Sequence, residues 1–216
     1  SLFRMVLNRI LTYLVSILIP TLIERKSVFN ELVDGIYKQI KQGGYEKKVE
    51  ILSICDDRSI PLSTKRNMMQ KISSGKYFMH LDDDDSLDEY FCESVVKHIE
   101  DLPIFQNNDP DVIGFNQLAK VRNGRFIVKP NINRDFKLTP IPRGKSNQTG
   151  YQEFERFPWQ WCLWHEKYKK IYRTDVDTNA REDQNWLKKL TLEYPKHMSY
   201  IDRVLHVYNF DDPSKT

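Results

Sequence analysis

The feature that most constrains the fold of this sequence is a threefold alternation of apolar runs and helix-like segments. Residues 13–19 (YLVSILI), 49–55 (VEILSIC) and 76–81 (KYFMHL) are short runs rich in aliphatic and aromatic residues, as expected of buried strands. Each run is followed by a segment in which apolar residues recur at helical spacing. Strand–helix units repeated in this way predict an α/β fold, in which helices cover both faces of a mainly parallel central sheet.

Capping residues predict where the helices begin. Ser63 or Thr64 is expected to start the second helix, with Met68, Met69 and Ile72 facing inward. Ser86 is expected to start the third helix as part of a capping box. These boundaries place polar residues between the end of each strand and the start of the next helix.

The second half of the sequence is less regular. Residues 111–117 and 125–128 are predicted to form a small antiparallel hairpin, with Asn123-Gly124 in its turn. A long loop over residues 129–158 contains several Pro, Gly and polar residues and is expected to border the site. The remaining predicted elements are helical segments at 165–171 and 180–190 and a strand at 200–208. A chain of 216 residues is expected to form one domain, residues 1–216.

Charge and composition exclude several classes of protein. The net charge of +3 is small, and Lys and Arg are interleaved with acidic residues, so nucleic acid is not an expected partner. The three cysteines have no disulfide or zinc spacing, which favours a reducing compartment. The apolar stretch at 10–19 is too short to cross a bilayer. We therefore expect no transmembrane segment and a cytoplasmic location.

The acidic run Asp82-Asp83-Asp84-Asp85 directly follows the third strand and is the strongest chemical signal. Four adjacent carboxylates repel one another unless cations or hydrogen-bond donors compensate their charge. Hard divalent ions such as Mn²⁺ or Mg²⁺ take such oxygens together with phosphate and water. The alternative is a solvated acidic turn that complements the dipole of the following helix, and this explains Asp85 well. For the run as a whole we favour a metal site.

Further candidates lie near the other strand ends. Thr21 follows the first strand, and Asp56-Asp57 ends the second, where Asp57 is either an ordinary turn residue or a hydrogen-bond partner of a nucleobase. Arg66 lies one turn into the second helix, as a solvated residue or as a partner of phosphate or carboxylates. In parallel sheets ligands bind beyond the carboxyl ends of the strands, which is where these residues are predicted to be.

The late part of the sequence supplies candidates for acceptor binding and catalysis. Glu182 and Asp183 open a helix, where acidic residues are common for capping and dipole reasons. A carboxylate in a cleft is also the usual general base for a sugar hydroxyl, so Asp183 is either a residue that complements the helix dipole or such a base. Trp159 and Trp161 are core residues or an apolar wall for a sugar ring.

The ordered segments VSILIPT, ILSICDD, STKRNMMQKISSGKYFMHLDDDD and REDQNWLKKL resemble the inverting, family-2 type of GT-A glycosyltransferases. The resemblance covers most of the chain. It implies a GT-A, Rossmann-like fold, with residues 1–100 as a nucleotide-sugar-binding half and 101–216 as an acceptor-binding half. One departure is Leu22-Ile23, which stands where the family usually has Tyr-Asn.

The resemblance also implies roles for individual residues. Thr21 would contact the nucleoside, Asp57 the uracil, and Arg66 the base or diphosphate. In the acidic run, Asp82 and Asp83 would lie at the ribose and the metal shell, and Asp84 would be the ligand of Mn²⁺ or Mg²⁺. Asp183 would be the catalytic base, and the acceptor-side residues are those at 159, 161 and 182.

The expected function is therefore a metal-dependent, inverting transfer of a sugar from a UDP-sugar donor to the hydroxyl of a glycan or another acceptor. A sugar-nucleotide pyrophosphorylase is the nearest alternative, although residues 22–25 (LIER) lack the glycines of its usual loop. A non-catalytic carbohydrate- or calcium-binding module is the alternative outside enzymes.

Overall fold

A computed structural model describes residues 13–103, 109–121, 124–134, 152–172, 182–193 and 195–209. Its helices are α1 (Lys26–Gly43), α2 (Leu62–Ile72), α3 (Phe91–Glu100) and α4 (Glu182–Leu192), with 3-10 turns η1 (Ile23–Arg25) and η2 (Glu166–Lys170). Its strands are β1 (Tyr13–Leu22), β2 (Val49–Asp56), β3 (Gly75–His80), β4 (Ser86–Leu87), β5 (Val112–Val121), β6 (Gly124–Pro130), β7 (Gln152–Arg156), β8 (Leu163–His165) and β9 (Met198–Asn209).

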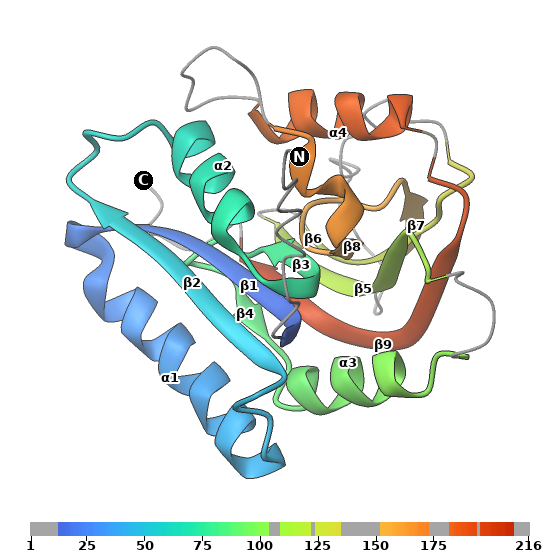
Figure 1. The fold of residues 1–216 in the computed structure, drawn as a ribbon, viewed down its shortest axis with the longest axis horizontal. Helices are drawn as coiled ribbons and strands as arrows, with labels where there is room; N and C mark the ends of the chain where they lie inside the picture. Colours follow the sequence, from blue (N-terminus) through green and yellow to red (C-terminus); the bar gives the residue numbers. More distant parts are fainter. Residues whose placement is uncertain are drawn as a thin grey trace, which may run out of the picture.

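One sheet runs through the described residues in the order β2-β1-β3-β8-β5-β6-β7, and β9 joins β4 to β5 (Figure 1). β1 pairs in parallel with β2 and with β3, as the three apolar runs predicted. β8 is antiparallel to both β3 and β5, and β9 is parallel to β5. The expected α/β class is confirmed, with a parallel first half and a mixed second half.

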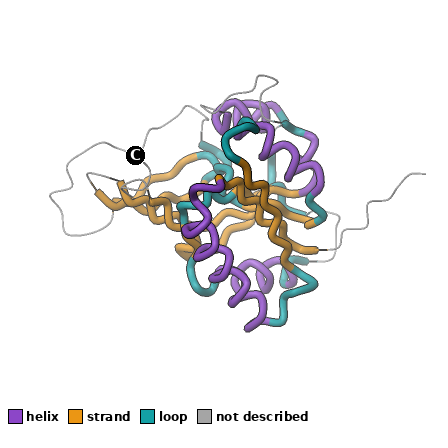
Figure 2. Tube along the Cα trace, turned by 90° about the vertical axis from the view of Figure 1, so that its left-hand side faces the viewer, coloured by secondary structure: helices purple, strands orange, loops and turns teal. Residues whose placement is uncertain are grey.

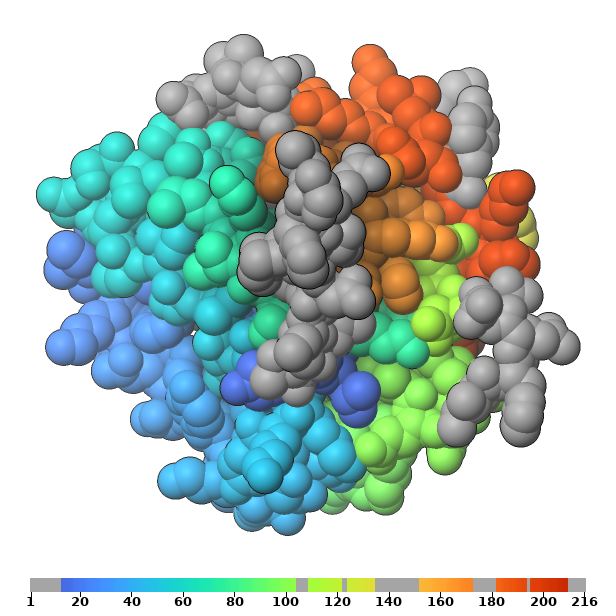
Figure 3. Space-filling model, in the orientation of Figure 1, coloured from blue at the N-terminus to red at the C-terminus, as the bar shows by residue number. Residues whose placement is uncertain are grey.

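Helices cover the sheet on two sides. In Figure 1, α1 and α3 lie below the strands, and α2 and α4 lie above them. Figure 2 shows the same layering from the side, with strands between two groups of helices. Residues 15–21 of β1 are all buried, because the strand lies between β2 and β3 and is covered on both faces. In the space-filling view of Figure 3, β2, α1 and α2 occupy the left side and α4 the upper right.

Two predictions about the helices were wrong. Met68 and Ile72 of α2 are 47% and 60% exposed, whereas Lys65 and Arg66 are buried. Ser86 does not start a helix, because it lies in β4 and pairs with Val207 of β9. α3 starts after Tyr90, without a side-chain cap.

The second half follows the predicted order with additions. β5 and β6 form the predicted antiparallel hairpin, and its turn residue Asn123 lies outside the described residues. The region expected as a helix at 165–171 is a short 3-10 turn, η2. Within the described residues, no helix has the length and apolarity needed to span a membrane. The lead-in helix expected at residues 1–11 lies outside the described residues.

Candidate active site

The carboxyl ends of β1, β2 and β3 meet at one edge of the sheet. The register pairs Thr21 with Cys55 and Leu18 with His80, so Thr21, Asp56 and the acidic run emerge side by side. Leu81 continues this alignment, because its amide donates to the carbonyl of Leu18 at 3.0 Å. The parallel register therefore brings together residues that are about sixty positions apart in the sequence.

The strand ends border a hollow of about 380 Å³, which we call the strand-end cavity. It combines a cationic and an acidic lining. Its lining residues are Pro20, Thr21, Leu22, Arg25, Arg58, Ile60, Leu62, Lys65, Arg66, Asp82, Asp83, Asp84 and Tyr208. Such a lining suits a ligand that carries negative charge and also accepts a cation, as a nucleoside diphosphate does.

Two side chains hold the acidic run in place. Thr21 Oγ1 donates to Asp83 Oδ2 at 2.7 Å. Arg25 bridges Asp83 and Asp84, with its Nη1 at 2.8 Å from Asp83 Oδ1 and its Nη2 at 2.6 Å from Asp84 Oδ2. Burial nevertheless raises the pKa of Asp83, and the charges of its acidic neighbours add to this effect. The hydrogen bond from Thr21 and the charge of Arg25 therefore compensate the negative charge of Asp83 only in part.

Arg66 connects this run to the helix α4. Its side chain is buried, and it forms ion pairs with Asp82 and Glu182. It also donates to Gln160 Oε1 at 2.8 Å. Burial opposes its charge, but the two carboxylates outweigh that cost and hold the pKa of Arg66 above its ordinary value. Arg66 is therefore a permanent cation that fixes the distance between the acidic run and the start of α4.

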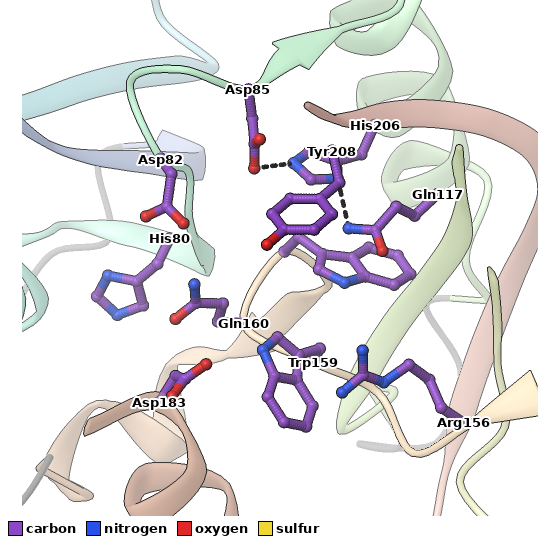
Figure 4. Close-up of a pocket in the computed structure, with 11 residues that line it drawn as sticks. His80, Asp82, Asp85, Gln117, Arg156, Trp159, Gln160, Asp183, His206 and Tyr208 are labelled. Carbon is purple, nitrogen blue, oxygen red and sulfur yellow. Dashed lines mark hydrogen bonds and ion pairs between the residues drawn. The ribbon is translucent and has the colours of Figure 1, made fainter. Parts of the chain in front are cut away.

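A second hollow of about 190 Å³, which we call the Trp159 cavity, adjoins the first (Figure 4). The two cavities share Asp82 and Tyr208. The residues that line it are His80, Asp82, Asp85, Gln117, Arg156, Trp159, Gln160, Trp161, Asp183, His206 and Tyr208. Because they come from β3, β5, β7, α4 and β9, only the folded chain assembles this cavity.

Asp183 presents its carboxylate to the Trp159 cavity from the first turn of α4 (Figure 4). Its Oδ1 accepts from the amide of Gln184 at 2.8 Å, and no ion pair with another described residue holds it. The other carboxylates of this cavity are paired, Asp82 with Arg66 and Asp85 with His206. Asp183 is thus the carboxylate of this cavity most accessible to a substrate proton.

Buried polar residues on β5 and β9 support the floor of the Trp159 cavity. His206 Nε2 lies 3.2 Å from Asp85 Oδ2, and Gln117 Nε2 lies 2.9 Å from His206 Nδ1. The Trp161 ring is parallel to the imidazole, at 5.8 Å between centroids. Tyr208 lies among the carboxylates, and burial together with their charge raises its pKa to about 12. Gln117, His206 and Tyr208 escaped the sequence analysis, because no local pattern links positions 117, 206 and 208 to the acidic run.

The structure separates the predicted residues into different environments. Thr21, Arg66, Asp82, Asp83 and Asp84 line the strand-end cavity, and Trp159, Trp161 and Asp183 line the Trp159 cavity.

Asp57 and Glu182 border neither cavity. Asp57 is exposed, and its Oδ1 accepts from the amide of Ser59 at 3.3 Å, whereas Asp56 is buried against Lys65. Glu182 is buried, and its carboxylate faces Arg66 instead of the cavity. Trp161 is only 3% exposed, so most of its ring belongs to the core, while Trp159 is more accessible.

The acidic run fits a hard divalent ion only if a ligand completes the site. Within the described ranges, no group of three or more His, Cys, Asp or Glu side chains is arranged to hold an ion. Mg²⁺ and similar ions commonly use one or two carboxylates and complete their shell with phosphate oxygens and water. Asp82 and Asp84 line the same cavity and can supply such a pair.

No protein-family model matches this sequence, and no curated protein sequence is similar to it. Its fold, however, is similar to solved structures of S. aureus TarS. The TarS 1-349 structure has a TM-score of 0.56 and 17% sequence identity, over 91% of this chain and 60% of that chain. The same fragment in complex with UDP-GlcNAc has a TM-score of 0.54 and 14% identity, over 90% of this chain and 58% of that one.

A third TarS structure, in complex with UDP, has a TM-score of 0.56 and 15% identity, over 90% of this chain and 60% of that one. This chain thus spans about 60% of the length of the TarS fragment. At this level of identity the likeness establishes a shared fold.

Proposed function

We propose that this chain is a glycosyltransferase that transfers a sugar from a UDP-sugar to an acceptor hydroxyl. One observation carries the proposal: a cavity lined by the acidic run and several cations adjoins a second cavity that contains the accessible carboxylate of Asp183. Asp82 and Tyr208 lie in both, which is where a donor and an acceptor would meet. The fold shared with TarS, of which a UDP-GlcNAc complex is known, supports a nucleotide-sugar donor.

In this proposal the strand-end cavity holds the donor. Thr21 and Asp83, joined by their 2.7 Å hydrogen bond, would contact the nucleoside. Asp82, which is paired with Arg66, would lie near the ribose. Asp84, with Asp82 beside it, would hold Mn²⁺ or Mg²⁺. Such an ion, when bound, stabilises the negative charge of a departing diphosphate.

In the Trp159 cavity, Asp183 would act as the general base. The acceptor hydroxyl gives its proton to Asp183 as its oxygen forms a bond to the anomeric carbon. The bond from that carbon to the diphosphate breaks at the same time, and the diphosphate leaves with the electron pair. A single displacement of this kind inverts the anomeric carbon. Trp159 offers an apolar ring surface against which the acceptor would lie.

Turnover distinguishes this function from its alternatives. Purified protein is incubated with UDP-sugars, Mn²⁺ and a set of glycan acceptors, and the nucleotide product is identified. Free UDP that depends on an acceptor supports the transferase. UTP formation that requires pyrophosphate would instead identify a pyrophosphorylase, and binding without turnover would identify a binding module.

The preference for uridine is a separate prediction, which rests on Asp57 as the partner of the uracil N3–H. Because Asp57 is exposed and outside both cavities, this contact requires the nucleobase to extend beyond the strand-end cavity. Calorimetry with UDP and ADP tests it, with Asp57→Asn as the variant. We expect UDP to bind about tenfold more tightly than ADP, and the variant to lose most of this preference. Equal binding of the two nucleotides by the parent protein would exclude the contact.

A further inference from the structure

Arg156 is the only described arginine that lines the Trp159 cavity. It is the last residue of β7, and its guanidinium carbon lies 3.8 Å from the centroid of the Trp159 ring. Stacking on an indole fixes the plane of the guanidinium and leaves its N–H groups pointing outward from the rim of the ring. The side chain is thus oriented before any ligand binds.

This guanidinium has no carboxylate partner among the described residues. The other three arginines that line the two cavities are compensated, Arg25 by Asp83 and Asp84, Arg58 by Glu24, and Arg66 by Asp82 and Glu182.

Arg156 is partly buried, and burial lowers its pKa to about 10, an effect that the more distant charge of Asp183 only partly offsets. It remains protonated at neutral pH. A guanidinium that is partly buried, oriented by an aromatic ring and without a carboxylate partner among the described residues is typical of a site that binds an anion.

The position of Arg156 identifies which substrate it serves. It lines the Trp159 cavity and is absent from the lining of the strand-end cavity, whose cations are Arg25, Arg58, Lys65 and Arg66. Figure 4 shows the Arg156 guanidinium and the Asp183 carboxylate on opposite sides of the Trp159 ring. A molecule in this cavity therefore meets a proton acceptor at one end and a cation at the other.

We propose that the acceptor carries a phosphate or carboxylate group that binds Arg156 while the attacking hydroxyl faces Asp183. This inference rests on the proposed function and specifies its acceptor as an anionic glycan. The Trp159 ring separates the two polar ends and supports the carbon skeleton between them. The anionic group would then determine which hydroxyl reaches Asp183, so Arg156 is a specificity-determining residue.

Three matched probes test the proposal on the full chain without a donor: methyl glucoside, methyl glucuronide and glucose 6-phosphate. Their binding is measured by ligand-observed NMR or calorimetry. We expect at least one anionic probe to bind about tenfold more tightly than the neutral glycoside, as a charge-assisted, bidentate contact predicts. The carboxylate and the phosphate probes show which of the two anions the site prefers.

Arg156→Gln should reduce the binding of the anionic probes to that of the neutral one and leave UDP binding unchanged. Arg156→Lys, which keeps the charge but not the planar fork, should retain part of the preference. Arg134→Gln is the matched control, because Arg134 is exposed and paired with Glu155. It should change neither measurement.

Three results would overturn the inference: equal binding of neutral and anionic probes by the parent, a preference that persists in Arg156→Gln, or displacement of the anionic probes by UDP. The first of these needs no variant and so does not depend on how the variants fold. Loss of the proposed function has a different signature, namely no binding of UDP-sugars while the anion preference, dependent on Arg156, remains.

Discussion

Asp82, Asp83 and Asp84 are consecutive in the sequence, yet each has a different partner. Asp82 pairs with the buried Arg66, Asp83 accepts from Thr21, and Asp84 pairs with Arg25, which also binds Asp83. The partners determine the chemistry of each carboxylate. Asp83 is nearly buried and is held as part of the loop, whereas Asp82, at 35% side-chain exposure, is more accessible to a ligand.

The proposed metal role of Asp84 predicts how chelation affects nucleotide binding. We expect UDP to bind at least about tenfold more weakly in EDTA than in Mn²⁺, because the diphosphate then faces the carboxylates without a cation. In Asp84→Ala, calorimetry should find weak binding in both conditions. Unchanged affinity of the parent protein in EDTA would exclude a metal at this position.

The raised pKa of Asp83 predicts a stability effect with a definite sign. Its ordinary value is 3.8, and a higher value in the folded protein means that the native state binds the proton more tightly than the unfolded state does. The contribution of Asp83 to the free energy of unfolding therefore decreases as pH rises through this interval. Asp83→Asn cannot ionise, so urea unfolding without metal should show the variant gaining stability relative to the parent from acidic to neutral pH.

Glu93→Gln provides a control of opposite sign. The hydrogen bond and charge of Lys97 lower the pKa of Glu93, so this variant should lose stability relative to the parent as pH rises. The explanation for Asp83 fails if the difference for Asp83→Asn is flat with pH or runs in the same direction as that for Glu93→Gln.

Sequence patterns predicted which segments border the two cavities but could not choose between neighbouring residues. Asp56 and Asp57 are identical in kind and adjacent, yet Asp56 is buried against Lys65 and Asp57 is exposed. Trp159 and Trp161 likewise differ in burial. Which of two neighbours is buried depends on which side of the turn faces the core. Distant residues determine this, because Lys65 pairs with Asp56 and His206 stacks on Trp161.

At the scale of elements, α2 shows why hydrophobic periodicity predicted its buried face only in part, since Met69 is buried as expected but Met68 and Ile72 are not. The helix buries polar side chains that find partners in other elements: Lys65 binds Asp56, and Gln70 donates to the carbonyls of Lys169 and Ile171. Met68 and Ile72 are left outward. A pattern that assumes apolar burial cannot detect a helix whose inner face is made of satisfied polar groups.

The buried pair of Lys65 and Asp56 predicts a large effect on stability. Lys65 also donates to the carbonyl of Thr21 at 3.1 Å, so it joins α2 to β1 and β2. Lys65→Ala removes the cation that pairs with Asp56 and should lower the free energy of unfolding well beyond the change seen for an exposed lysine. Chemical denaturation measures the change. Lys38→Ala, on the exposed face of α1, is the control and should stay within about 0.5 kcal/mol of the parent. An equally small loss for Lys65→Ala would contradict the structural role of the pair.

The short strands β4 and β8 could not be predicted. β8 has only three residues, yet it inserts between β3 and β5 and joins the two halves of the sheet. β4 has two residues and exists because β9 passes beside it. Such elements depend on long-range pairing and have no local periodicity, whereas the strands β1, β2 and β3 were predicted because their apolar runs are local features.

At the scale of the whole molecule, the sheet places two cavities side by side, one at the ends of β1, β2 and β3 and one lined by later elements. The sequence predicted the first of these well, because ligands bind beyond the carboxyl ends of parallel strands. The second was predicted only through Asp183, Trp159 and Trp161. Arg156 was missed, because a single arginine in a polar segment gives no signal before the fold stacks it on Trp159.

The central claim is that Asp183 removes the proton of an acceptor hydroxyl during sugar transfer, and one comparison tests it most directly. UDP release that depends on an acceptor is measured in parent protein and in Asp183→Asn, with a UDP-sugar and Mn²⁺, alongside calorimetric binding of UDP. We predict that transfer falls by roughly two to four orders of magnitude in the variant while UDP binding stays close to that of the parent. A folded Asp183→Asn protein that transfers sugar at nearly the parent rate would contradict the claim and leave Asp183 as a residue of the helix end.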